Sequence, residues 1–243
     1  MCEDCGCGDH ELVPVEVQQR ILSENDRTAA HNREHFEEAG VLAINLMGSP
    51  GSGKTALLEA TARAAGGRLR LSAVSGDLAT ERDADRLSAA GINAKAITTG
   101  SACHLDANLL HRALHDLDWH DADILFVENV GNLVCPAVYD LGEAARVVAL
   151  SVTEGEDKPL KYPVMFHKAD LVIVTKADLL PHLEVDMDAL RDALGRVMPD
   201  PQVLVVSAKT GEGIYRWLGW LASRRPHHHP EHAHPHSHPT AHR

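Results

Sequence analysis

Aromatic residues and clusters of basic residues are scarce in this sequence. Its 243 residues include only three Trp, three Tyr and three Phe, so a core must be built mostly from aliphatic side chains. The net charge is −12 with His neutral, and no run of Lys and Arg interrupts this acidic balance. Because proteins need such runs to neutralise phosphate backbones, we expect no nucleic-acid partner.

Long apolar segments are missing as well. No run approaches the roughly 20 residues that span a bilayer. The acidic start, Met1-Cys2-Glu3-Asp4-Cys5, lacks the apolar region of a secretory signal. We therefore expect no membrane insertion and a cytoplasmic location. Cytoplasmic thiols stay reduced, so clustered cysteines there indicate metal binding before disulfides.

Composition divides the chain into four zones. A Cys-rich arm at 1–12 and a polar segment at 13–39, compatible with one or two helices, come first. Short apolar runs that alternate with amphipathic stretches then fill 40–224, which suits one α/β domain. The tail at 225–243 is rich in Pro and His. We expect it to be disordered and to bind Ni²⁺, Zn²⁺ or Cu²⁺ loosely.

The third zone predicts a mostly parallel sheet with helices on both faces, because continuous β-branched runs separated by helical stretches are typical of that architecture. The expected strands are Val41–Met47, Leu69–Ser75, Lys95–Thr98, Ile124–Glu128, Arg146–Val152, Leu171–Thr175 and Gln202–Val206. The expected helices include Ala56–Ala65, Glu81–Ala90, Ala107–His115, Met187–Val197 and Ile214–Ala222. Ligands of such sheets bind beyond the carboxyl ends of the strands.

A phosphate-binding loop follows the first expected strand. Its sequence is Gly48-Ser49-Pro50-Gly51-Ser52-Gly53-Lys54-Thr55, which is G-x-x-x-x-G-K-[ST] between a strand and a helix. Glycines let backbone N–H groups surround phosphate oxygens, and the helix N-terminus adds positive charge. Lys54 is expected to reach the β- and γ-phosphates, and the Thr55 hydroxyl to bind Mg²⁺. The loop predicts a nucleoside triphosphate ligand.

Two later strand ends predict guanine as the base. Thr175-Lys176-Ala177-Asp178 resembles the Asn-Lys-x-Asp signature of GTPases, whose Asp carboxylate accepts bonds from guanine N1–H and the exocyclic amine. Adenine has the opposite polarity there, so the carboxylate rejects it. Ser207-Ala208-Lys209 matches the companion element that packs on the base. Thr175 replaces the usual Asn, a change expected to weaken the bracing of this loop.

Candidate switch residues end two further strands. Asp77 lies where switch residues reach a γ-phosphate, and Glu128-Asn129-Val130-Gly131 resembles an Asp-x-x-Gly switch with Glu substituted. Glu128 could hold Mg²⁺ through water, and the Gly131 N–H could bond the γ-phosphate. With Lys54, these acidic residues are the catalytic candidates. No water-orienting Gln or internal arginine finger stands out, which predicts slow intrinsic hydrolysis, below roughly 1 s⁻¹.

Cysteine and histidine positions predict two metal sites. Cys2-x-x-Cys5-x-Cys7 places three thiolates together, and with the amine of Cys2 they suit planar Ni²⁺, although Zn²⁺ fits the same thiolates tetrahedrally. Cys103, His104 and Cys135 form the second set, which a symmetric dimer could complete. Cys135 follows the switch closely, so phosphate status and metal affinity would be coupled. His111 and His115 share a helix face and are interpreted as surface histidines.

These motifs together resemble one family, the hydrogenase nickel-incorporation GTPases (HypB). The resemblance rests on the Cys-rich start, the phosphate loop, Gly76-Asp77, Thr-Gly-x-x-Cys-His at 99–104 and Glu-Asn-Val-Gly-Asn-Leu-Val-Cys-Pro at 128–136. It implies a SIMIBI-type P-loop GTPase that dimerises with GTP and delivers Ni²⁺ to the large subunit of [NiFe] hydrogenase. It also implies help from a zinc-binding maturation partner, a high-affinity nickel site at the N-terminal thiols and a second Ni²⁺ or Zn²⁺ site at the dimer interface.

Three other functions fit parts of the sequence. A urease-accessory nickel GTPase shares the nucleotide chemistry, but its metal motif is Cys-Pro-His, whereas Cys135-Pro136 is followed here by Ala137. A non-enzymatic nickel store would use the N-terminal thiols and the tail only. A P-loop kinase for a small molecule would need neither the guanine elements nor paired metal sites.

Overall fold

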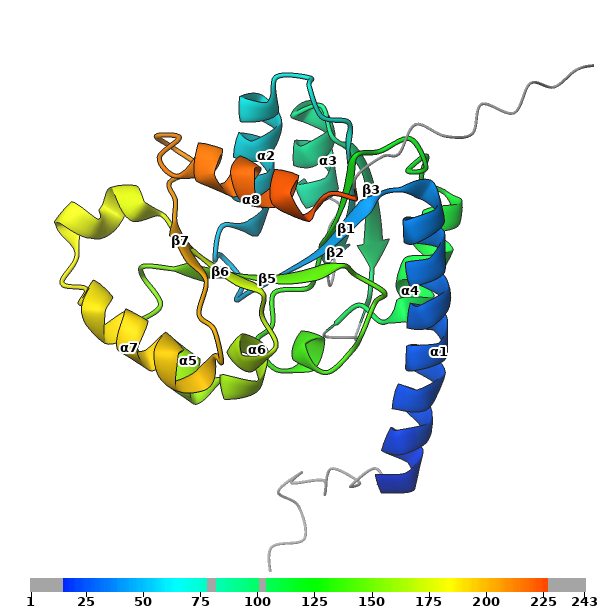
Figure 1. The fold of residues 1–243 in the computed structure, drawn as a ribbon, viewed down its shortest axis with the longest axis horizontal. Helices are drawn as coiled ribbons and strands as arrows, with labels where there is room; N and C mark the ends of the chain where they lie inside the picture. Colours follow the sequence, from blue (N-terminus) through cyan, green and yellow to red (C-terminus); the bar gives the residue numbers. More distant parts are fainter. Residues whose placement is uncertain (1–14, 78–81, 101–103, 227–243) are drawn as a thin grey trace, which may run out of the picture.

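The computed structural model describes residues 15–77, 82–100 and 104–226. Seven parallel strands form one sheet in the order β3-β2-β4-β1-β5-β6-β7 (Figure 1). The strands are β1 (Leu42–Met47), β2 (Leu71–Asp77), β3 (Asn93–Thr98), β4 (Ile124–Glu128), β5 (Ala145–Ser151), β6 (Leu171–Thr175) and β7 (Val203–Val205). The predicted fold class is confirmed.

Helices cover both faces of this sheet. The helices of the described residues are α1 (Val15–Ala39), α2 (Lys54–Ala65), α3 (Arg82–Ala89), α4 (Ala107–His115), α5 (Lys158–Lys161), α6 (Pro163–His167), α7 (Met187–Val197) and α8 (Ile214–Arg224). Two short 3₁₀ turns accompany them, η1 (Cys135–Ala137) and η2 (Ala177–His182). Helices α2, α3 and α8 lie on one side of the sheet, and α1, α4 and α5–α7 lie on the other (Figure 1).

Alternation along the central strand explains the two layers. Leu42, Ile44 and Leu46 of β1 enter the core beneath α2 and α8, whereas Ala43 enters the core beneath α1 and α4. Every residue of β1 is buried, as expected for a strand covered on both faces. Burial of these aliphatic side chains contributes a stabilising free energy of about 25 cal/mol per Å² of apolar surface. It takes the place of the burial of large aromatic side chains, of which the sequence has few.

Strand β2 differs most from its expected bounds. It runs through Gly76 to Asp77 because its backbone pairs with β3 as far as the Asp77–Thr98 register. The sequence gives no sign of this extension, since Gly and Asp are poor strand formers. The pairing therefore carries Asp77 to the carboxyl end of the sheet, next to β4.

Helix α1 is a single helix of 25 residues that is fastened to the domain by buried amides. The Asn25 amide donates to the Asp140 carbonyl at 2.8 Å, and its carbonyl accepts the Ala107 N–H at 2.9 Å. Asn32 donates to the carbonyls of Ala107 and Leu141 at 3.1 and 3.2 Å. Leaving buried polar groups of this kind unpaired costs free energy. These hydrogen bonds therefore hold α1 in place against the domain. No helix of the described residues is long and apolar enough to cross a membrane.

Replacing Asn25 should therefore loosen α1. We expect Asn25→Ala to lower the free energy of unfolding by about 2–3 kcal/mol, because it leaves a buried carbonyl and a buried N–H unpaired. Denaturant unfolding followed by far-UV circular dichroism measures this change. Glu24→Ala, on the exposed side of the same helix, is the control and should shift the value by less than about 0.5 kcal/mol. Equal losses in the two variants would refute the anchoring role.

Candidate nucleotide and metal sites

The loop between β1 and α2 has the backbone that phosphate binding requires. Gly51 and Gly53 adopt φ of 74° and 90°, in the left-handed region that disfavours side chains. A Cβ at Gly48 would collide with the backbone oxygen of Ala149. Helix α2 begins at Lys54, so its first N–H groups and its positive dipole end face the loop.

Two polar side chains of this loop are buried in ways that fit an anion. The Lys54 ammonium, only 8% exposed, donates to the carbonyls of Gly48 and Ser49 at 3.3 Å each. The Ser52 hydroxyl is fully buried and has no hydrogen-bond partner within the described residues. An unpaired buried hydroxyl costs stability, and a phosphate oxygen would satisfy it. The loop therefore suits the phosphates of a nucleotide.

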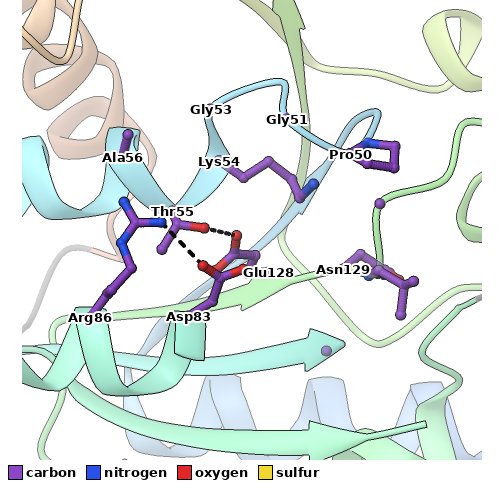
Figure 2. A pocket seen from close by; sticks show the side chains of 13 residues that line it. Pro50, Gly51, Gly53, Lys54, Thr55, Ala56, Asp83, Arg86, Glu128 and Asn129 are labelled. Atoms are coloured by element: carbon purple, nitrogen blue, oxygen red, sulfur yellow. Dashed lines mark hydrogen bonds and ion pairs between the residues drawn. The ribbon is translucent and has the colours of Figure 1, made fainter. Parts of the chain in front are cut away.

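Two oxygen-bearing side chains that could hold a magnesium ion, Thr55 and Glu128, meet beside the loop (Figure 2). The Thr55 hydroxyl donates to Glu128 Oε1 at 2.6 Å, and the Ser75 hydroxyl donates to Oε2 at 3.2 Å. Burial raises the pKa of Glu128, against the opposing effects of the Thr55 hydrogen bond and the Lys54 charge. Hydroxyl and carboxylate oxygens are what Mg²⁺ prefers, and a cation there would stabilise the ionised carboxylate.

The Gly131 segment touches the phosphate loop directly. A Cβ at Gly131 would lie 2.9 Å from atoms of Pro50, so only glycine allows this approach. Gly48 also pairs with Asn132 through an isolated antiparallel bridge. The predicted switch residue and the loop are therefore neighbours. Asp77 ends β2 at the same rim, but its side chain lies outside the described residues.

Two residues of α3 join this site without any motif to mark them. Asp83 and Arg86 line the same cavity, of about 420 Å³, as Lys54, Thr55 and Glu128. The Arg86 guanidinium donates to both carboxylate oxygens of Glu59 at 3.0 Å and to Asp83 Oδ1 at 3.2 Å. An arginine that the sequence analysis did not single out thus lines the phosphate cavity. The spacing of Asp83 and Arg86, one turn apart in the helix after β2, is the only signal that the sequence offers.

The guanine-type loop after β6 is tied to the phosphate loop. The Thr175 hydroxyl donates to the Ser52 carbonyl at 2.5 Å. A bracing contact is therefore present although Thr replaces the usual Asn, and a weaker brace than Asn would give stays a prediction. Lys176 adopts φ of 60°, the only positive φ of a non-glycine residue in the described chain. Such strain is typical of functional sites.

The specificity carboxylate is positioned by its companion element. Asp178 Oδ1 accepts a hydrogen bond from the Ser207 hydroxyl at 2.6 Å, and Lys209 Nζ lies 3.9 Å from Oδ2. The Ser207 hydrogen bond lowers the pKa of Asp178, so the carboxylate is ionised at neutral pH and accepts hydrogen bonds only. Ala208 lies between the two side chains that contact Asp178. The two sequence elements that are predicted to bind the base therefore contact one another.

The second metal set is only partly within the described residues. Cys103 lies outside them, as do Cys2, Cys5 and Cys7. The His104 ring stacks on Tyr139, with centroids 4.0 Å apart and planes at 16°. Cys135 is half-buried at the start of η1, four residues before Tyr139. The stacking therefore brings the His104 loop and the Cys135 segment together, and burial lowers the pKa of His104, which favours the neutral imidazole.

One buried amide connects this metal loop to the switch. Asn129, which follows Glu128, accepts the Leu105 N–H at 3.1 Å through its Oδ1. Leu105, next to His104, is fully buried, and its side chain fills the space over Gly76, where a Cβ would meet it at 2.8 Å. Both switch strands therefore contact the residue that follows the metal-ligand candidate. No sequence signal marks this contact.

Comparison with known proteins agrees with this geometry. The model of the family described as CobW/HypB/UreG, nucleotide-binding domain, matches residues 42–205. The hydrogenase maturation factor HypB of Azotobacter chroococcum mcd 1 is 52% identical over 211 residues, which are 87% of this chain and 69% of the relative. The chain belongs to the HypB family. The resemblance drawn from the motifs is confirmed, and the family together with the P-loop fold marks a GTPase-type hydrogenase maturation factor.

Two solved HypB structures share the fold over most of their length. HypB from Archaeoglobus fulgidus has a TM-score of 0.77 at 40% identity and covers 83% of this chain and 98% of its own. HypB from Helicobacter pylori, solved in complex with nickel, has a TM-score of 0.80 at 40% identity and covers 83% and 95%. The protein of Helicobacter pylori is named a hydrogenase/urease maturation factor.

Proposed function

We propose that this chain is a GTP-hydrolysing nickel metallochaperone that inserts Ni²⁺ into the large subunit of [NiFe] hydrogenase. The observation that carries the proposal is the Asn129–Leu105 contact, which joins the switch after Glu128 to the loop of His104. A second path runs from Gly48 through the bridge to Asn132, three residues before Cys135. Movement of the switch on loss of the γ-phosphate would displace both candidate ligands.

The nucleotide chemistry assigns a role to each predicted residue. Lys54 and the loop N–H groups bind the phosphates, Thr55 and Glu128 hold Mg²⁺, which neutralises phosphate charge, and Asp178 selects guanine. Asp77 and the Gly131 N–H would sense the γ-phosphate. Intrinsic hydrolysis is slow, because Arg86 is engaged by two carboxylates and so cannot fully offset transition-state charge.

Dimerisation with GTP would complete the second metal site. Val134 and Val138, on either side of Cys135, are 58% and 43% exposed, and Val164 at the neighbouring helix α6 is 53% exposed. Exposed apolar side chains that gather in this way mark protein contacts. A two-fold axis there would bring Cys135 from two chains together, with Cys103 and His104, as ligands for Ni²⁺ or Zn²⁺.

Metal cargo would enter through the N-terminal thiols Cys2, Cys5 and Cys7, whose soft donors suit Ni²⁺ or Zn²⁺. A zinc-binding maturation protein and the precursor of the hydrogenase large subunit are the proposed partners, in the cytoplasm. Urease is a second candidate target, because a relative 40% identical is named a hydrogenase/urease maturation factor.

Replacing Asn129 tests the coupling. In the wild type we expect Ni²⁺ affinity to differ by about 10-fold between the GTP and GDP states, a usual size for coupled sites. Asn129→Ala removes the acceptor of the Leu105 N–H, so the difference between the two affinities should shrink to what the Gly48–Asn132 path alone transmits. Competition with a chromophoric chelator measures both. Because Asn129 also lines the phosphate cavity, guanine nucleotide affinity is measured in the same variant, and the nickel affinities are compared at saturating nucleotide.

Asn45→Ala is the matched control, since Asn45 is a buried partner of Asn129, at 3.3 Å, that does not contact Leu105. It should lose stability but keep the nucleotide dependence. If folded Asn129→Ala retains the wild-type ratio of affinities, the proposed link is wrong. If the wild type itself hydrolyses no GTP and releases nickel equally in every nucleotide state, the chain is a store rather than a chaperone.

A further inference from the structure

Four histidines meet on the face of α1 and α4, away from the nucleotide site. His31 and His35 lie one turn apart on α1, and His111 and His115 lie one turn apart on α4. The interpretation of the latter two as ordinary surface residues is incomplete, because the rings of His31 and His111 are 5.3 Å apart and those of His35 and His111 are 6.3 Å apart. We name this group the four-histidine cluster.

The nitrogen spacing within each helix suits a chelated ion. The Nε2 atoms of His31 and His35 are 3.0 Å apart, and those of His111 and His115 are 3.3 Å apart. Two imidazole nitrogens bound at 2.0–2.1 Å to one ion, at angles between square and tetrahedral, are about 2.9–3.4 Å apart. In each pair the distance between the two Nε2 atoms is therefore that of two nitrogens bound to one ion. The same distance also fits a hydrogen bond between the two rings.

A second observation concerns the orientation of His111. Its Nδ1 lies 2.9 Å from Asn32 Oδ1. The Asn32 amide nitrogen donates to two backbone carbonyls, so its oxygen is fixed as an acceptor and His111 Nδ1 must carry the proton. The neutral ring then directs the lone pair of Nε2 toward the cluster. Metal-binding histidines are oriented in this way by a carbonyl partner, and Asn32 is fully buried.

The surroundings favour a cation. His35, His111 and His115 line one cavity together with His120, Asp118 and Asp116, whose carboxylate lies 3.4 Å from the Lys95 ammonium. Within the described residues no three donor groups converge on one point, so the rings meet as two pairs rather than as a finished site. His31 and His115 are exposed, and exposed side chains change rotamer rapidly. The proposed site therefore requires a rotamer change of these two rings, so that both pairs reach one ion.

We propose that the four-histidine cluster binds a borderline divalent transition-metal ion, Ni²⁺ or Zn²⁺, that clamps α1 to α4. Imidazole is the ligand that such ions share. This site is independent of the cysteine ligands and of the nucleotide, so it would stand even if the proposed function fails.

Residue-specific carbethoxylation of the full-length protein tests the proposal, because peptide mass spectrometry distinguishes the cluster from the His-rich tail. With Ni²⁺ or Zn²⁺ we expect modification of all four histidines to slow by at least about 10-fold, while Mg²⁺ has no effect. His167, exposed on α6 and outside this cavity, is the internal control and should react at an unchanged rate.

The decisive comparison separates one shared site from two independent pairs. In His31→Ala/His35→Ala the metal should no longer protect His111 and His115 at the concentration that protects them in the wild type. Unchanged far-UV circular dichroism and an unchanged His167 rate establish that the variant is folded, and His167→Ala serves as the matched substitution. Full protection of the α4 pair in the double variant, or no protection in the wild type, would overturn the proposal.

Discussion

Asp178→Asn should lower GTP affinity by at least about 100-fold and give the protein a preference for xanthosine triphosphate. The carboxylate accepts two hydrogen bonds from guanine, and hydrogen bonds to charged groups are worth about 1.5–3 kcal/mol each. An amide donates where guanine also donates, but it complements the C2 carbonyl of xanthine. The Ser207 contact survives, because the amide oxygen can still accept from that hydroxyl. Isothermal titration with GDP, GTP and their xanthine counterparts measures the switch.

The control for this prediction is Asp200→Asn, which removes an exposed carboxylate beyond the end of α7. It changes the net charge by the same amount as Asp178→Asn. It should leave the affinities of all four nucleotides within about twofold of wild type. Unaltered GTP affinity in Asp178→Asn would remove the basis for assigning guanine to this site.

Lys54→Ala should reduce kcat/KM for GTP by about 10³-fold. The ammonium is the buried charge nearest to the phosphate loop, and removing one such group from a phosphoryl-transfer site commonly costs this much. Single-turnover hydrolysis with excess protein measures the loss. Lys54→Arg should recover little, because a planar guanidinium does not fit a pocket shaped for a point charge.

Lys161→Ala is the control, since Lys161 is an exposed lysine that is paired with Asp157 at 2.6 Å and does not line the phosphate cavity. Its activity should match the wild type. If Lys54→Ala is folded and hydrolyses GTP at a wild-type rate, the loop is not the catalytic phosphate site.

The sequence predicts the parts of this protein that depend on local pattern. Apolar runs predict the strands, because burial on both faces selects uniformly aliphatic residues. The phosphate loop and the Asp178 element are contiguous motifs, so they can be found without a structure. Their convergence at one rim follows from the parallel sheet alone.

What the sequence does not predict depends on contacts between distant segments. Asn129 and Leu105 are 24 residues apart, and Asn25 meets Asp140 across 115 residues. The histidine pairs of α1 and α4 are about 80 residues apart, and nothing local indicates that the helices pack together. The left-handed conformation of Lys176 is likewise imposed by the surrounding loops, because its side chain carries no preference for it.

Nickel affinity in the two nucleotide states tests the central claim most directly. A full-length variant with Cys2, Cys5 and Cys7 replaced by Ala leaves the thiolates of the second site as the source of sulfur-to-nickel charge-transfer absorption, a signal that the histidines of the tail do not produce. The account predicts that Ni²⁺ dissociation constants with a non-hydrolysable GTP analogue and with GDP differ by about 10-fold. Equal constants would contradict it.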